Sequence, residues 1–347
     1  MTDLTAEPLP AELHPAVDAL IAESGITANR SLIRRLLATG ILLGQEKTSR
    51  LDLKIASAAI VEMRDAFRLF RPYADVPKVT VFGSARTRQE DPLYRQAREV
   101  AAALATRGWM VVTGAGPGIM QAAAEGAGER MALGVSIRLP FEEKPNVVVA
   151  KDTHSVEMKY FFTRKLMLVK ESSGFICLPG GFGTMDEMFE LLTLQQTGKA
   201  EPTPIVLLDA PGGTFWHGLK GFVDEQLIPA GVISPDDFDR VLITDSAEAA
   251  VAEITGFWRN YDSLRWVDDR LVLRLKHVPT DAEIASLNAE FAPFLASGRI
   301  ERTEALPIEV SDRDRVELPR VALRLGQREV GGLYRLIDAL NALPSAG

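Results

Sequence analysis

The chain has 347 residues, of which 46% are hydrophobic and 25% charged, so it is long enough for two domains with buried cores. Its formal net charge of −8 argues against a binder of duplex DNA, because such proteins carry a basic face, and we expect no nucleic-acid partner. The four histidines show no HExxH-like spacing, and the single cysteine, Cys177, lies in an apolar run typical of a buried strand. We therefore expect neither a metal site nor an intrachain disulfide.

The chain begins with acidic and proline-containing sequence, without a basic region followed by an apolar core. No apolar run approaches the roughly 20 residues that a membrane span needs. The sequence accordingly predicts a soluble, cytoplasmic protein with no membrane partner.

Residues 1–76 are predicted to form a helical N-terminal extension. Residues 30–43 and 49–70 carry apolar side chains at three- and four-residue spacing, which is typical of helices with one apolar face. Residues 71–77 contain two prolines and break this periodicity, so they are expected to form a linker.

Residues 77–257 alternate between short apolar runs and helical patterns. Strands are expected at residues 78–83, 109–113, 132–137, 146–150, 174–178, 205–208 and 241–243. Helices are expected between most of them, for instance at residues 92–107, 118–129, 157–171 and 184–197. This alternation predicts an α/β fold, a Rossmann-like doubly wound parallel sheet with helices on both faces. Such sheets bind ligands beyond the carboxyl ends of their strands.

Residues 258–347 change in character and predict a small α+β domain. Strands are expected at residues 270–275 and 320–325, and helices at 281–295 and 330–343. This region contains no motif that indicates chemistry.

Two glycine-rich turns each follow a predicted strand and open a predicted helix. The first turn, residues 113–118, contains Gly114, Gly116 and Gly118, and the second is residues 179–184. Glycine lets the backbone approach a ligand closely, and a helix N-terminus offers unpaired N–H groups that suit a phosphate. Neither turn matches a dinucleotide fingerprint or a Walker loop. A glycine-rich turn is also often only a tight connection, so the first turn leaves both interpretations open.

The second turn is more informative because Glu187 follows Thr184 by three residues. That spacing places the Glu187 carboxylate about one turn deeper, roughly 5 Å along the helix axis, where the ribose of a bound nucleotide would meet it. The alternative is that Glu187 only complements the positive end of the helix.

Arg164 and Lys165 stand between two apolar segments of a predicted helix. A fully solvated face is not available to both cations, and partly buried cations need partners such as a ligand phosphate or an active-site carboxylate. The alternative is that they reach the surface or form a structural ion pair.

The string PGGFGTMDE at residues 179–187 resembles the PGGxGTxxE signature of the "lonely guy" family of phosphoribohydrolases. The resemblance extends to residues 82–86, to the loop at residues 114–120 and to the Arg164-Lys165 pair, and it covers about residues 78–208. It implies a Rossmann-like fold and hydrolysis of a nucleoside 5′-monophosphate, AMP or N6-modified AMP (a cytokinin nucleotide), to free base and ribose 5-phosphate. It also implies that active sites are completed in a homodimer or higher homo-oligomer. We expect no cofactor.

Carried over by position, the resemblance implies that Arg164 and Glu187 are the catalytic pair. The residues it implies in substrate binding are Gly83, Ser84, Gly114, Gly116, Gly118, Lys165, Gly180, Gly181, Phe182, Gly183 and Thr184.

The chain departs from the compact plant members of this family in three places. It has a long helical N-terminus, an additional C-terminal domain, and Phe162-Thr163 where compact members tend to have polar residues. Some relatives bear a lysine decarboxylase label, but nothing in the sequence indicates a pyridoxal phosphate lysine. Two other functions remain open on the same fold: a carrier or sensor that binds a nucleotide or phosphorylated cofactor without hydrolysing it, and an interaction protein whose site is vestigial.

Overall fold

The computed structural model describes residues 13–139, 154–238, 240–326 and 330–347. Contacts between residues divide the chain into two units, Met1–Arg64 and Asp65–Gly347. The division falls inside helix α3 (Arg50–Phe70), which therefore contributes to both units. The domain boundaries predicted after residues 76 and 257 are a different division and stay predictions.

The first unit is helical. It contains α1 (His14–Glu23), α2 (Arg30–Gln45) and the start of α3, which confirms the helices predicted at residues 30–43 and 49–70. Val17 and Ile21 of α1 are buried with Ala38 of α2 in a small apolar core.

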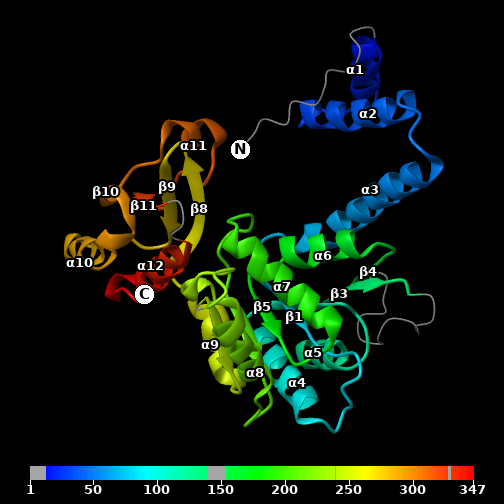
Figure 1. The fold of residues 1–347 in the computed structure, drawn as a ribbon. Helices are drawn as coiled ribbons and strands as arrows, with labels where there is room; N and C mark the ends of the chain where they lie inside the picture. Colours follow the sequence, from blue (N-terminus) through cyan, green and yellow to red (C-terminus); the bar gives the residue numbers. More distant parts are fainter. Residues whose placement is uncertain (1–12, 140–153, 239, 327–329) are drawn as a thin grey trace. The chain divides into compact units, whose positions relative to one another are not determined.

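The second unit contains a seven-stranded, wholly parallel sheet with the strand order β4-β3-β2-β1-β5-β6-β7 (Figure 1). Its strands are β1 (Lys78–Phe82), β2 (Met110–Thr113), β3 (Ala132–Ile137), β4 (Ser155–Met158), β5 (Phe175–Cys177), β6 (Ile205–Leu208) and β7 (Val241–Thr244). Successive strands grow outward from β1 in one direction and from β5 in the other. The predicted doubly wound α/β fold is therefore confirmed, with its topological switch between β1 and β5.

Helices cover both faces of this sheet. On one face, α4 (Pro92–Ala105), α5 (Ile119–Ala127) and α9 (Ala247–Gly256) pack against the strands in a single apolar core that includes Val79 and Val81 of β1. Thr80 points to the opposite face, because side chains alternate along a strand, and its hydroxyl donates to the Leu168 carbonyl of α6 (Phe161–Lys170). The second face is therefore the one that α6 covers (Figure 1).

Strand β4 corrects part of the prediction. The strand expected at residues 146–150 lies outside the described residues, so that prediction is not tested. β4 occupies Ser155–Met158, where no strand was predicted. Its predicted helical neighbour begins later, at Phe161 rather than at residue 157. The segment was missed because β4 is a short edge strand of mixed polarity, in which Glu157 is exposed, so it lacks the apolar run of a buried strand.

The C-terminal part of the second unit is a four-stranded antiparallel sheet with the order β10-β11-β9-β8. β9 (Arg270–Leu275) and β11 (Arg320–Leu325) confirm the two predicted strands, whereas β8 (Tyr261–Val267) and β10 (Leu295–Arg302) were not predicted. Helices α10 (Asp281–Phe291) and α12 (Val330–Asn341) share an apolar core with one face of this sheet. The predicted α+β architecture is confirmed.

Helix α10 is shorter than predicted. It ends at Phe291 instead of residue 295, because a 3-10 turn with a proline follows and β10 then begins at Leu295. A short helix, α11 (Pro307–Asp312), precedes β11.

Hydrogen bonds join the C-terminal part to the loops that precede β5 and β6 of the parallel sheet. The Trp258 indole donates to the Ser173 carbonyl at 2.7 Å, and the Thr203 amide donates to the Tyr334 hydroxyl of α12 at 3.3 Å. Ser173 and Thr203 lie just before the amino ends of β5 and β6, at the edge of the sheet opposite to the glycine-rich turns. The C-terminal part therefore leaves the carboxyl edge of the sheet to other residues.

Candidate functional site

The loops that follow β1, β2 and β5 meet at the carboxyl edge of the sheet, because these three strands are neighbours. The Ser84 carbonyl after β1 accepts from the Ile119 amide at 3.0 Å, which fixes the start of α5. Gly118 has a φ of +66° and lies so close to the Ser84 carbonyl that a Cβ would collide with it. The predicted binding residues Ser84 and Gly118 are thus brought together.

The remaining glycines of the first two loops make room for neighbouring side chains. A Cβ on Gly83 would collide with Ile119, and one on Gly114 would collide with the Arg164 guanidinium. A Cβ on Gly116 would meet only the flexible end of the Met120 side chain, which can move. Packing therefore explains why Gly83 and Gly114 are glycine but not why Gly116 is, and the role of all three in binding substrate stays a prediction.

Helix α7 (Phe182–Gln196) begins in the loop after β5, with Gly181 as its N-cap. Gly180 is required by packing, since a Cβ there would collide with the Thr184 side chain. Gly181 and Gly183 differ, because a Cβ on either would meet nothing within 4 Å, and neither has a positive φ. Neither packing nor backbone conformation explains these two glycines, whereas an anion seated on the helix N-terminus would.

Thr184 and Phe182, both in the first turn of α7, differ in solvent exposure. Thr184 is buried, with its hydroxyl directed toward Gly180. The Phe182 side chain is 94% exposed. Both residues lie beside Gly181 and Gly183, as the sequence predicts. The Phe182 ring does not pack into the apolar core.

Arg164 lies on α6 and is 8% exposed. Its Nε donates to the Val135 carbonyl of β3 at 2.9 Å, and its Nη2 donates to the Gly114 carbonyl at 3.4 Å. Its Nη1 lies 3.5 Å from Oε1 of Glu187 on α7. These bonds hold a guanidinium between the first glycine-rich loop and the Glu187 carboxylate, so the two predicted catalytic residues are neighbours.

Glu187 is largely buried, its side chain being 14% exposed. Burial raises its pKa to about 7, against the opposing effect of Arg164 and Lys165 and with a smaller contribution from Asp186 and Glu190. A carboxyl whose pKa lies near neutral pH can exchange a proton under physiological conditions, which is the property of a general base or acid.

Lys165 on α6 forms ion pairs with two acidic residues of α7. Its Nζ lies 3.0 Å from Oδ2 of Asp186 and 2.6 Å from Oε2 of Glu190. Burial lowers the pKa of Lys165, but its bonds to Glu190 and Asp186 outweigh this and raise it. Asp186 and Glu190 were not among the predicted site residues, although their four-residue spacing on one side of α7 is the signal in the sequence. Lys165 therefore clamps α6 to α7, and its predicted contact with substrate stays a prediction.

Other chemistry is less favoured at this edge. Cys177 is fully buried in β5, and burial raises the pKa of its thiol, so a nucleophilic role is disfavoured.

Among the residues that the structure describes, no cluster of histidine, cysteine, aspartate and glutamate is arranged to hold a metal ion. Within the same ranges, no helix is both long and apolar enough to cross a membrane.

Comparison with known proteins identifies relatives of the parallel-sheet region. Residues 118–254 match the model of a family described as "Possible lysine decarboxylase". A cytokinin riboside 5′-monophosphate phosphoribohydrolase of Mycobacterium tuberculosis (strain ATCC 25618 / H37Rv) is 32% identical over 167 residues, which are 46% of this chain and 83% of the relative. The enzyme of the same name from Mycobacterium marinum is 30% identical, with the same coverage of both chains. Arabidopsis thaliana LOG1, also a phosphoribohydrolase by name, is 33% identical over 94 residues, 27% of this chain and 42% of its own.

Solved structures give a more distant likeness. The molybdenum cofactor binding protein of Rippkaea orientalis matches 52% of this chain and 96% of its own, at 22% identity and a TM-score of 0.38. The molybdenum cofactor carrier protein of Chlamydomonas reinhardtii matches the same shares at 21% identity and a TM-score of 0.37. These scores are too low to bear on function.

Proposed function

Because this chain belongs to the lonely guy family of phosphoribohydrolases, we propose that it hydrolyses the N-glycosidic bond of nucleoside 5′-monophosphates, AMP or N6-modified AMP. The products would be the free base and ribose 5-phosphate. The observation that carries the proposal is the placement of Glu187, a buried carboxyl with a pKa of about 7, one helical turn behind an open glycine-rich helix N-terminus and 3.5 Å from Arg164.

The 5′-phosphate would occupy the N-terminus of α7. Gly181 and Gly183 leave space there that no described side chain fills, and the unpaired N–H groups of the first turn attract an anion. A phosphate at this place directs the attached ribose toward Glu187.

Glu187 would act on the anomeric carbon of the ribose. Departure of the base develops positive, oxocarbenium-like charge there, which a nearby carboxylate stabilises. The ionised Glu187 would also take a proton from the attacking water as its oxygen bonds to that carbon. The N-glycosidic bond breaks with its electron pair on the base nitrogen, which then gains a proton, so the overall reaction consumes one water.

Arg164 would hold the reacting groups in place. Its Nε and Nη2 are bound to the backbone carbonyls of Val135 and Gly114, which fixes the plane of the guanidinium. The guanidinium would bind ribose or phosphate oxygens next to Glu187, while its charge keeps part of the Glu187 population ionised. The same rigid fork explains why lysine would be a poor replacement.

A second copy of this chain would cover the aromatic side chains beside the site. Large apolar side chains on α6 and α7 are 40–94% exposed, which is unusual for so many on adjoining helices: Phe161, Phe162, Leu166, Phe182 and Phe189. Their burial against a partner subunit fits the homodimer or higher homo-oligomer that we propose for the active form.

Product analysis tests this proposal. Purified protein incubated with AMP and with N6-modified AMP is expected to release base and ribose 5-phosphate, and Glu187→Gln is expected to lose about 10²–10⁴-fold of the rate. Asp186→Asn is the matched control, because it removes a neighbouring carboxylate that is 64% exposed and is expected to keep most activity. Near-normal turnover by Glu187→Gln would contradict the assignment of this residue. Saturable binding of all monophosphates without release would indicate a carrier instead.

A further inference from the structure

The C-terminal sheet has one apolar face and one arginine-rich face. Leu271 and Leu273 of β9 belong to the core shared with α10 and α12, so the alternating residues Arg270 and Arg274 point away from it. On β11 the same alternation turns Arg320 and Arg324 to the outer face. The register pairs Arg274 with Arg320, and Leu271 with Leu323, so Arg270 and Arg324 are also next to each other across the two strands.

One half of this arginine-rich face is closed. Glu309 of α11 lies 2.7 Å from Arg274 and 2.9 Å from Arg320, and all three side chains are nearly inaccessible. Asp314 adds a second carboxylate to Arg274 at 2.6 Å. These cations have buried anionic partners, so this half has a structural role.

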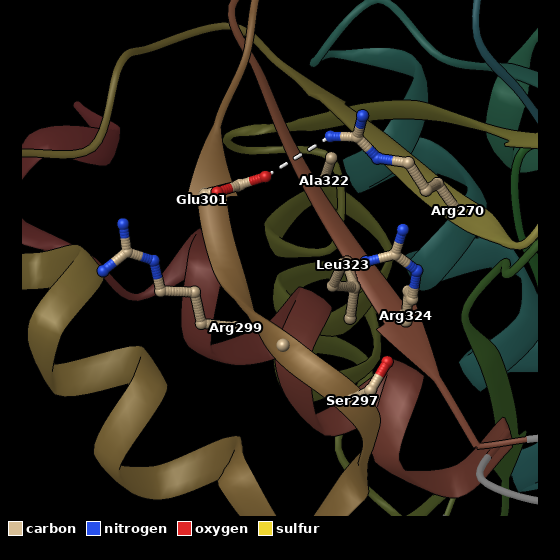
Figure 2. A pocket seen from close by; sticks show the side chains of 8 residues that line it. Arg270, Ser297, Arg299, Glu301, Ala322, Leu323 and Arg324 are labelled. Atoms are coloured by element: carbon tan, nitrogen blue, oxygen red, sulfur yellow. Dashed lines mark hydrogen bonds and ion pairs between the residues drawn. The ribbon is translucent and has the colours of Figure 1, made fainter.

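The other half is an open hollow of about 430 Å³. Arg270 and Arg324 lie on one side of β10 together with Glu301, whereas the Arg299 guanidinium points away from them (Figure 2). Arg270 lies 3.5 Å from Glu301, and Arg324 lies 2.7 Å from Asp269. Both carboxylates are at least half exposed, so these pairs contribute little and can exchange for another anion.

An irregular stretch of β10 lines the hollow. Ser297 pairs with Arg324 and Glu301 pairs with Ala322, so β10 contains more residues between these points than β11 does. Asn288 of α10 fixes this bulge, because its side chain binds both the amide and the carbonyl of Ile300 at 2.8 Å. The bulge therefore lies beside Arg324, in the part of β10 that lines the hollow.

We propose that this hollow binds a small molecule bearing a diphosphate or triphosphate group. Arg270 and Arg324, adjacent on antiparallel strands, each present a planar fork that matches one phosphate group, and the Ser297 hydroxyl adds a donor at the mouth. A volume of about 430 Å³ suits a ligand of nucleotide size. The net charge of −8 and the carboxylates at the rim disfavour a long polyanion such as RNA. The site is independent of the carboxyl-edge site proposed above.

Calorimetric titration of the full chain with inorganic pyrophosphate tests this proposal. The Arg270→Ala/Arg324→Ala double variant is expected to bind pyrophosphate at least about tenfold more weakly, since it loses charge-assisted hydrogen bonds. Arg299→Ala removes a charge from the same rim without removing a fork from the hollow, and is expected to stay within about twofold. All proteins in this titration carry Glu187→Gln, which slows turnover of any contaminating nucleotide.

The outcomes separate this site from the phosphate position at α7. Binding that survives in the double variant but disappears in Gly181→Ala would place pyrophosphate at α7 and overturn the proposal. Equal loss in Arg299→Ala would show a diffuse charge effect and would contradict the proposal. Absence of pyrophosphate binding by the protein that retains Arg270, Arg299 and Arg324 would also contradict it. If a single-stranded RNA binds through Arg270 and Arg324 and pyrophosphate does not, the proposed class of ligand is wrong. Failure of AMP hydrolysis would bear only on the proposed reaction.

Discussion

Arg164 and Glu187 approach each other to 3.5 Å across the carboxyl edge of the sheet, yet the pKa of Glu187 is raised to about 7. An arginine at this distance favours the ionised carboxylate, but burial of the Glu187 side chain outweighs it. Arg164 therefore does not keep Glu187 fully ionised at neutral pH. It leaves a carboxyl that is ready to take or give a proton at neutral pH.

The rate of hydrolysis should accordingly depend on pH through Glu187. Because the ionised form is the base, kcat/KM is expected to rise with pH, to reach half its plateau near pH 7, and to fall about tenfold for each unit below that. Asp186 and Glu190 raise the pKa of Glu187, so Asp186→Asn/Glu190→Gln should shift the limb to lower pH. Initial rates with AMP across the pH range measure both effects. A profile that stays flat to pH 5 would exclude Glu187 as the base.

Removal of Arg164 should affect both the rate and this pH limb. Arg164→Met is expected to lower kcat/KM by about 10²–10³-fold, because a preorganised charge at the reacting centre is lost. The pKa of Glu187 should rise further, since burial then acts with less opposition, and the acid limb should move to higher pH. Arg107→Ala, an exposed arginine at the end of α4, is the control and should behave as wild type. A rate loss without any shift of the limb would show that Arg164 does not act on Glu187.

The sequence predicts the central strands of the parallel sheet well because they are buried on both faces. A continuous apolar run such as that of β6 marks such a strand directly. Strands β8 and β10 were missed because their outward residues are polar or charged, as in Arg265 and Glu301, and short β4 has the same defect. Their strand character depends on pairing with neighbours that are distant in the sequence.

The candidate site shows the same division. The spacing of Glu187 from the glycine-rich turn could be read from the sequence, as could the need of Arg164 for a partner. That this partner includes the Val135 carbonyl could not, because the contact depends on β3 lying beside α6. Nor does the sequence distinguish the glycines that packing requires, such as Gly180, from those that face open space, such as Gly181.

That distinction between Gly180 and Gly181 is testable with matched alanine variants. Gly181→Ala should fold with nearly normal stability, since its Cβ meets nothing within 4 Å, but should raise the KM for AMP by crowding the phosphate position. Gly180→Ala should instead destabilise the fold by about 1–3 kcal/mol, because its Cβ would collide with Thr184. Thermal denaturation and steady-state kinetics separate the two effects. Equal KM values for Gly181→Ala and wild type would exclude phosphate binding at this turn.

The closed half of the arginine-rich face should depend strongly on Glu309. Burial alone would raise the pKa of this carboxyl, but bonds from the Leu306 amide, Arg274 and Arg320 hold it below its usual value. Glu309→Gln leaves the two buried guanidinium groups short of an anion and is expected to reduce the free energy of unfolding by about 3–5 kcal/mol. Urea denaturation followed by tryptophan fluorescence, which includes Trp266 on β8, measures this loss.

The control for this prediction is Asp312→Asn, which weakens an ion pair with Arg265 whose carboxylate is 47% exposed. It is expected to cost no more than about 1 kcal/mol, because solvent screens such pairs. The Glu309 contribution also has a defined pH dependence. Since its folded pKa is lowered, the stabilisation is present above the usual glutamate pKa and is lost as pH falls through the lowered folded value. Similar stability losses for the two variants at neutral pH would show that burial does not strengthen the Glu309 network.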